Sequence, residues 1–237
     1  MTGTIINTAA IVAGGVCGHL FGKLLKERHQ ETLTMACGVG TIFLAIAGAM
    51  NYMLHHEQLP GGGSMLVIAC LALGGLIGET LNIESWFERF GEWLKRKTGN
   101  AKDRQFVNGF VTASLTVCIG AMAIMGSIQD GLYGDWSTLG AKSILDLIIV
   151  MVMTSSMGKG CAFSAIPVFL WEGGLTLLAA AIRPVMTDTA MSYLSLVGSV
   201  LIFCVGLNLV FGKKVRVANL LPAVVLAVIA AFLPIQF

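Results

Sequence analysis

Long apolar stretches alternate with short polar links along the whole chain. Eight stretches are about 20 residues long, the length that an α-helix needs to cross the apolar core of a bilayer. Polar residues, Gly or Pro bound each of them. The pattern predicts an all-α fold, a polytopic transmembrane helical bundle that forms a single integral membrane domain over residues 1–237. The predicted spans are Thr4–Phe21, Thr34–Leu54, Met65–Asn82, Val107–Gly126, Leu139–Gly158, Cys161–Ile182, Ser192–Phe211 and Ala218–Phe237.

One segment between the third and fourth spans has a different pattern. In Ile83–Lys97, apolar residues recur at helical spacing and charged residues occupy the opposite face. This pattern predicts an amphipathic helix on the cytoplasmic surface of the membrane, with Trp86 and Trp93 at the level of the lipid headgroups. The alternative is a helix that docks a cytoplasmic partner.

The composition supports a membrane location. Hydrophobic residues make up 56% of the chain and charged residues 12%, and the mean hydropathy is +0.82. A soluble domain carries roughly 25% charged residues, because its surface must be hydrated. The 29 glycines suit helices that pack closely in lipid. The net charge of +2 gives no reason to expect a nucleic-acid partner.

The positions of the basic residues predict an orientation. Thirteen of the 15 Lys and Arg residues lie in the links after the first, third, fifth and seventh spans, which share one side of the membrane, and only Lys142 and Arg183 fall on the other side. Cytoplasmic links are rich in Lys and Arg, so the basic side is predicted to be cytoplasmic. Both termini are then predicted on the opposite side, which for a bacterial inner-membrane protein is the periplasm.

Two glycine motifs indicate an internal repeat of a helix pair. Gly14–His19 in the first span and Gly74–Glu79 in the third share the pattern GGxxGx. Ala45–Gly48 in the second span resembles Ala123–Gly126 in the fourth. The larger offset of the second match is explained if the amphipathic segment was inserted into the second copy. Such a repeat would be parallel rather than inverted.

Ionisable side chains within predicted spans are candidates for function, because burying them in lipid is costly. Glu172 lies near the middle of the sixth span. It is either a proton, cation or substrate site, or a neutral side chain that is hydrogen-bonded inside the bundle. Lys142 and Asp146 lie four residues apart in the fifth span. They form either an ion pair shielded in the bundle or the lining of a vestibule that opens to the outside.

Two further segments carry polar residues of interest. The link Ser127–Asp135 on the outer side contains Gln129, Asp130 and Asp135, which would gather cations or orient a polar substrate, or would serve an ordinary turn. In Thr154–Pro167, two glycines flank Lys159, and Pro167 is expected to kink or end a helix. This stretch is either a tight cytoplasmic hairpin or a broken helix that lines an anion site.

Four other polar residues are expected to make hydrogen bonds between helices: Asn7, Ser114, Asn208 and Asn219. Ser114 is also placed on the candidate pathway. The six cysteines lie in or beside apolar segments without the spacing of a metal site, and are expected to be small buried residues. No sequence motif points to an enzyme, a catalytic residue, a metal site or a cofactor.

Several stretches together resemble a known family. They are Gly3–Asn7, Ala113–Ala123, Gly126–Leu132, Lys142–Asp146 and Val217–Ala223. The chain resembles the bacterial inner-membrane proteins of domain-of-unknown-function family 554, of the YqgA/YdfK type, over nearly its whole length. The resemblance implies a polytopic bacterial membrane protein that is loosely described as a transporter. The family commonly has Gln where this chain has Glu172. This difference argues against an essential proton role for Glu172 and makes Asp130, Asp135, Lys142 and Asp146 the stronger candidates.

These observations favour a small secondary transporter or channel for an ion or small polar solute, embedded in the lipid bilayer and compatible with a homodimer. Its candidate pathway comprises Ser114, Gln129, Asp130, Asp135, Lys142, Asp146, Lys159 and Glu172. The alternative is a non-transporting scaffold or sensor that docks a partner through the amphipathic helix.

Overall fold

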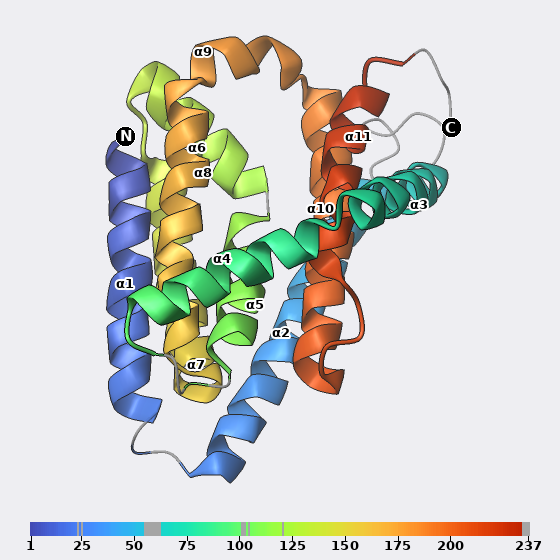
Figure 1. Ribbon diagram of the computed structural model, residues 1–237. Helices are drawn as coiled ribbons and strands as arrows, with labels where there is room; N and C mark the ends of the chain where they lie inside the picture. Colours follow the sequence, from blue (N-terminus) through green and yellow to red (C-terminus); the bar gives the residue numbers. More distant parts are fainter. Residues whose placement is uncertain are drawn as a thin grey trace. The chain divides into compact units, whose positions relative to one another are not determined.

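The described part of the chain is helical. A computed structural model describes residues 1–22, 24, 26–54, 63–100, 103, 105–119 and 121–233 (Figure 1). The elements are α1 (Thr2–Gly22), α2 (Glu27–Met53), α3 (Gly63–Leu81), α4 (Ile83–Lys97), α5 (Phe106–Cys118), α6 (Ala121–Tyr133), α7 (Ser137–Met157), η2 (Lys159–Ser164), α8 (Ala165–Leu177), α9 (Ala179–Ile182), η3 (Arg183–Val185), α10 (Asp188–Phe211), η4 (Val217–Leu220) and α11 (Pro222–Ala230).

Each of the eight apolar segments is mainly helical over its described residues, which confirms the predicted all-α fold class. Among the described residues, six helices are long and apolar enough to cross a membrane: α1, α2 from Arg28, α3, α7, η2 with α8, and α10. The eighth segment is a shorter apolar helix, Val217–Ala230, and its predicted end at Phe237 lies outside the described residues.

The fourth predicted span is not one straight helix. It divides into α5 and α6, which are bent by 61° at a short break. Because α6 continues to Tyr133, Gln129 and Asp130 lie in a helix, and the prediction of a polar link over Ser127–Asp135 is wrong for most of its length. Ser127 and Asp130 are buried, so these two polar side chains of the helix face protein rather than water.

Helix α1 has the polarity of a membrane helix, with apolar side chains outside and small or polar residues inside. Its buried residues recur every three or four positions, which places them on one face. They are Gly3, Thr4, Asn7, Ile11, Gly14, Gly15 and Gly18. The exposed residues include Ile5, Val12, Val16 and Leu20. Lipid can solvate this apolar outer face.

The described residues group into two compact units. The first, unit 1, comprises Met1–Cys37, Ser85–Cys118 and Met122–Ala181. The second, unit 2, comprises Gly38–Glu84, Ile119–Ala121 and Ile182–Phe237. Each unit contains one of the two GGxxG motifs.

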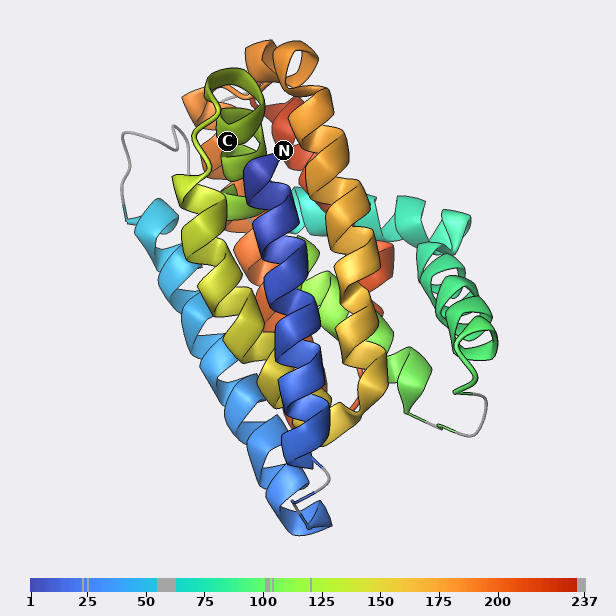
Figure 2. The same ribbon diagram turned by 90° about the vertical axis from the view of Figure 1, so that its left-hand side faces the viewer.

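In unit 1, α1 lies beside α7 and α8 (Figure 2). The glycines of its motif make this close approach possible. A Cβ atom on Gly18 would lie 2.2 Å from the backbone oxygen of Met151 in α7. A Cβ atom on Gly15 would lie 2.3 Å from the Cβ atom of Ala162 in η2.

In unit 2, the glycines of α3 have the same effect on its contacts with η4 and α11. A Cβ atom on Gly78 would lie 1.8 Å from the backbone oxygen of Asn219, and one on Gly74 would lie 2.4 Å from the backbone nitrogen of Ala223. Both predicted motifs are therefore sites of close helix packing, each within its own unit.

The turn after α7 is the hairpin favoured by the sequence. Gly158 has a φ of +89°, a value that Gly adopts readily, and the chain then runs back through η2 and α8 (Figure 2). Pro167 is the third residue of α8. The first N–H groups of a helix have no partner within it, so Pro is tolerated there, and the expected helix end at Pro167 is wrong because α8 continues to Leu177.

We expect Gly18→Ala to lower the thermal unfolding temperature of the protein purified in detergent. The added methyl group would meet backbone atoms of α7, and such overpacking costs about 1–3 kcal/mol. Gly40→Ala is the matched control, because nothing lies within 4 Å of the added atom in α2. Equal unfolding temperatures for Gly18→Ala and Gly40→Ala would contradict the packing role of the motif.

Candidate functional site

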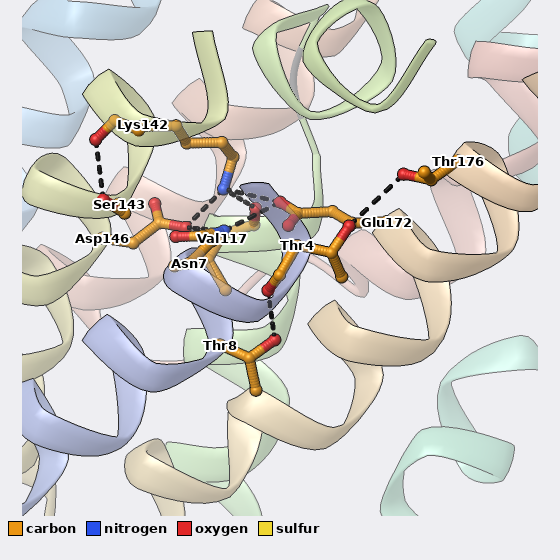
Figure 3. A network of polar contacts seen from close by, with 10 residues as sticks. Thr4, Asn7, Thr8, Val117, Lys142, Ser143, Asp146, Glu172 and Thr176 are labelled. Atoms are coloured by element: carbon orange, nitrogen blue, oxygen red, sulfur yellow. Dashed lines mark hydrogen bonds and ion pairs between the residues drawn. The ribbon is translucent and has the colours of Figure 1, made fainter. Parts of the chain in front are cut away.

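Four buried polar side chains from three helices of unit 1 meet in one cluster (Figure 3). Asn7 comes from α1, Lys142 and Asp146 from α7, and Glu172 from α8. Their exposed fractions are 0%, 6%, 4% and 0%. We call this group the Lys142 cluster. Its four members lie within helices that are apolar enough to span a membrane.

The Lys142 ammonium group is at the centre of the cluster. It forms an ion pair with Asp146 Oδ2, lies 3.4 Å from Glu172 Oε1, and donates to the backbone oxygen of Val117 at 2.9 Å. An ammonium group has three N–H donors, and three acceptors surround this one. The pairing of Lys142 with Asp146 confirms a shielded ion pair, and the low exposure of both residues argues against an open vestibule lining.

The contact with Val117 depends on the break in the fourth span. Val117 is the penultimate residue of α5, so its carbonyl lies in the last turn, where backbone oxygens lack the usual intrahelical partner. The C-terminal end of a helix also carries partial negative charge, which favours a cation. The bend between α5 and α6 thus presents a backbone acceptor to Lys142.

Asn7 connects α1 to both acidic residues. Its side-chain nitrogen donates to Asp146 Oδ2 at 3.0 Å and to Glu172 Oε1 at 2.8 Å. The predicted hydrogen bond of Asn7 between helices is confirmed, but Asn7 is not among the predicted pathway residues. Its spacing from Gly14 and Gly18, which places all three on one face of α1, was the available signal.

Two oxygen atoms of the cluster have no hydrogen-bond partner among the described residues. They are Asn7 Oδ1 and Glu172 Oε2, and both are buried. A buried acceptor without a partner is costly and calls for an explanation. The cluster also contains two acidic groups and one ammonium group, so its charges do not balance if both acids are ionised.

Polar contacts continue from the cluster toward the N-terminal end of α1. One turn away, the hydroxyl oxygens of Thr4 and Thr176 lie 3.3 Å apart, and both residues are buried. Beyond them, the N–H group of Gly3 donates to Asp130 Oδ2 at 3.0 Å. The N-terminal amino group of Met1 lies 2.7 Å from the same oxygen. We call Asp130, Thr4 and Thr176 the polar ladder.

The remaining predicted pathway residues have other surroundings. Gln129 accepts a hydrogen bond from the Thr138 hydroxyl at 2.6 Å. Ser114 is buried, and its hydroxyl has no partner in the described part of the chain, so its expected hydrogen bond between helices is not observed. Lys159 is exposed at the start of η2. None of the three makes a hydrogen bond or ion pair with the Lys142 cluster among the described residues.

Asp135 is fully exposed just before α7. Its Oδ1 accepts a hydrogen bond from the backbone N–H of Ser137 at 3.0 Å. Hydrogen bonds from the side chain and the backbone of Ser137 lower the pKa of the Asp135 carboxyl from its usual value. This role at the start of a helix is structural.

A second polar cluster lies in unit 2, and its charges balance. Asn219 donates to Glu79 at 2.6 Å and accepts from the backbone N–H of Glu84 at 2.7 Å, as expected for a hydrogen bond between helices. Arg216 forms an ion pair with Glu79, and Lys213 lies 2.6 Å from Glu84. In these two pairs of described residues, two cations match two acids.

Asn208 does not link two helices as predicted. Its side chain donates to the backbone oxygen of Val215 at 2.7 Å and accepts from the backbone N–H groups of Lys214 and Val215. It therefore fixes the link that follows its own helix, because the backbone groups of an irregular segment need partners in place of water.

Comparison with known proteins supports the expected resemblance. The family described as protein of unknown function, DUF554, matches residues 2–232. The uncharacterized membrane protein YdfK of Bacillus subtilis (strain 168) is 32% identical over 232 residues, which cover 98% of this chain and 96% of that protein. The uncharacterized protein YqgA of Escherichia coli (strain K12) is 30% identical over 229 residues, which cover 95% and 94%. No solved structure matches the chain significantly.

We expect Lys142→Met to destabilise the protein by about 3–5 kcal/mol, because removing one partner leaves buried acidic groups without a cation. The double variant Lys142→Met with Asp146→Asn should recover much of this loss, because it also removes an acidic group while keeping its shape. Unfolding of both variants in detergent would be compared with that of the unmodified protein. A double variant that is no more stable than Lys142→Met would contradict a charge-based role for Lys142.

Proposed function

The chain belongs to the DUF554 family of membrane proteins, and on that premise we propose that it is a small secondary transporter or channel for an ion or small polar solute. The Lys142 cluster is its central site. The observation that carries this proposal is an uneven set of buried charges, two acidic groups and one ammonium group, at a break in a membrane helix. Ionisable groups inside a membrane and discontinuous helices are both typical of transport sites.

A comparison of the two units supports a functional role for these charges. If the GGxxG motifs are aligned, Asn7 corresponds to Val67 in α3. If the glycines that follow α7 and α10 are aligned, Lys142 corresponds to Leu196, and if Pro167 and Pro222 are aligned, Glu172 corresponds to Ala227. These three counterparts in unit 2 are apolar and buried: Val67, Leu196 and Ala227. Unit 2 thus packs the corresponding positions without charge, so packing alone does not require the cluster.

The polar ladder is the proposed route between the cluster and the outer side. Asp130, the Thr4–Thr176 pair and the cluster follow one another along α1, since Asp130 accepts from Gly3, and Thr4 lies about one helical turn from Asn7. Lys159 and the exposed Asp135 are not part of this route.

The proposed orientation places the ladder at the periplasmic face of a bacterial inner membrane. The Lys and Arg residues in the links, apart from Lys142 and Arg183, define the cytoplasmic side. The N-terminal end of α1, where the ladder begins, then lies on the outer side together with the link between α6 and α7.

The exposed face of α4 favours a second candidate function. Trp86, Phe90 and Trp93 lie at spacings of four and three residues, and they are 70%, 36% and 52% exposed. Arg89 and Arg96 are exposed beside this aromatic face. An aromatic face flanked by Arg suits either a headgroup surface or a cytoplasmic partner, so a non-transporting scaffold or sensor is the alternative.

The purified protein would be placed in liposomes on a solid-supported membrane, where charge movement is recorded as a current. We expect a current when the proton or sodium concentration is changed, or when one of a panel of amino acids and carboxylic acids is added. Asp146→Asn should abolish this current because it alters the charge of the central site. Glu84→Gln is the matched control, since Glu84 is a buried acid in the balanced cluster of unit 2. A protein that gives no current with any of these probes would favour the scaffold alternative.

The orientation makes a separate prediction. In a background without the native cysteines, Asp135→Cys should react with a membrane-impermeant maleimide added to whole cells, and Thr98→Cys should react only after the membrane is opened. Both positions are exposed and follow a helix end, so they differ chiefly in side. The reverse pattern of labelling would overturn the orientation.

A further inference from the structure

The Lys142 ammonium is already saturated by its surroundings. Asp146 Oδ2, Glu172 Oε1 and the Val117 carbonyl are its three acceptors. Loss of its proton would remove one of these contacts and leave the acidic groups without a cation. Lys142 is therefore the fixed positive charge of the cluster.

One negative charge then remains if both acids are ionised. The surroundings of the cluster are apolar helices, where an unbalanced charge is costly. One proton or one monovalent cation would restore neutrality. The charged groups that face Glu172 are Lys142 and Asp146, both on α7. Asn7 on α1 is neutral, and Cys118 on α5 is a thiol close enough to interact with the cluster.

The unpaired oxygens favour a proton over a metal cation. A hard cation takes about six oxygen ligands. The cluster has only two buried oxygens without a partner in the described structure, Glu172 Oε2 and Asn7 Oδ1. A proton needs only one atom to hold it. Asp146 is the less suitable carrier, because it forms the closer ion pair with Lys142, whereas Glu172 lies 3.4 Å from the ammonium group and keeps a buried Oε2 without a partner among the described residues.

We propose that the cluster carries a single exchangeable proton on Glu172 Oε2, and that this proton is the coupling ion of the transporter. This inference rests on the proposed transport function. Release converts the neutral carboxyl to a carboxylate, and the proton leaves along the Thr176 and Thr4 hydroxyls toward Asp130. Uptake reverses the step, so each exchange moves one proton and changes the charge of the cluster by one.

Infrared spectroscopy of the purified full-length protein in lipid tests whether a carboxyl group of the cluster is protonated. A protonated carboxylic acid gives a C=O stretching band that shifts in D₂O. We expect such a band at neutral pH in the unmodified protein and none in Glu172→Gln. Glu84→Gln is the control and should keep the band, since Glu84 has its own cation, Lys213.

The Asp146→Asn variant distinguishes two reasons for a neutral Glu172. Glu172 holds the proton either because Asp146 and Glu172 share one ammonium group, or because of its packing alone. With Asp146 neutral, Lys142 balances Glu172, so the band should disappear even though Glu172 is still present. Lys142→Met should add a second protonated carboxyl. A band that persists in Asp146→Asn, or that is absent from the unmodified protein, would overturn the proposal.

The two proposals fail in different ways. The expected set of bands without charge movement in liposomes would support the proton site and overturn transport. Charge movement without a carboxylic acid band would keep transport and overturn the proton site.

The route is tested by the rate at which the band shifts after transfer to D₂O. Thr176→Val should slow this exchange, because it removes a hydroxyl of the ladder. Thr8→Val is the matched control: its hydroxyl donates to the backbone oxygen of Thr4 in its own helix at 2.8 Å. Equal exchange rates in the two variants would overturn the route through Thr176.

Discussion

The buried ammonium group of Lys142 is the interaction on which unit 1 depends. It contacts acids from two helices and a backbone carbonyl from a third, so it joins α7, α8 and the end of α5 at one point. Water cannot hydrate a charge at this depth, and the protein must supply every partner. The end of α5 supplies one of these partners through the Val117 carbonyl, and the amide of Asn7 donates to both acids.

The glycine motif of α1 supplies the geometry for this arrangement. Asn7 reaches Asp146 and Glu172 only because α1 lies close to α7 and α8, and Gly14 and Gly18 leave no side chain to hold the backbones apart. In lipid, such close packing contributes much of the helix association, because apolar side chains gain little by leaving one apolar medium for another.

The contrast between the two units separates scaffold from function. Both contain a GGxxG helix, a long helix that ends at a Gly with positive φ, and a 3-10 turn that leads into an apolar helix. Unit 1 holds an uneven set of charges within its spans, whereas the charged residues of the unit 2 cluster balance two against two. The positions of unit 2 that match Asn7, Lys142 and Glu172 are the buried apolar residues Val67, Leu196 and Ala227, so this plan packs there without charged groups.

The sequence alone determined the class of fold, most helix positions and the pair Lys142–Asp146, because span length, apolar composition and i,i+4 spacing are local properties. It also indicated that the Glu172 side chain is costly to bury within a membrane span. It did not reveal that α5 and α6 are separate helices, because both halves are apolar and a break leaves little trace in composition. Nor did it reveal that Glu172 and the Val117 carbonyl meet Lys142, or that Asn7 meets Asp146 and Glu172. Those contacts join residues up to 165 positions apart, and only the packing of α1, α5, α7 and α8 decides which buried polar groups become partners.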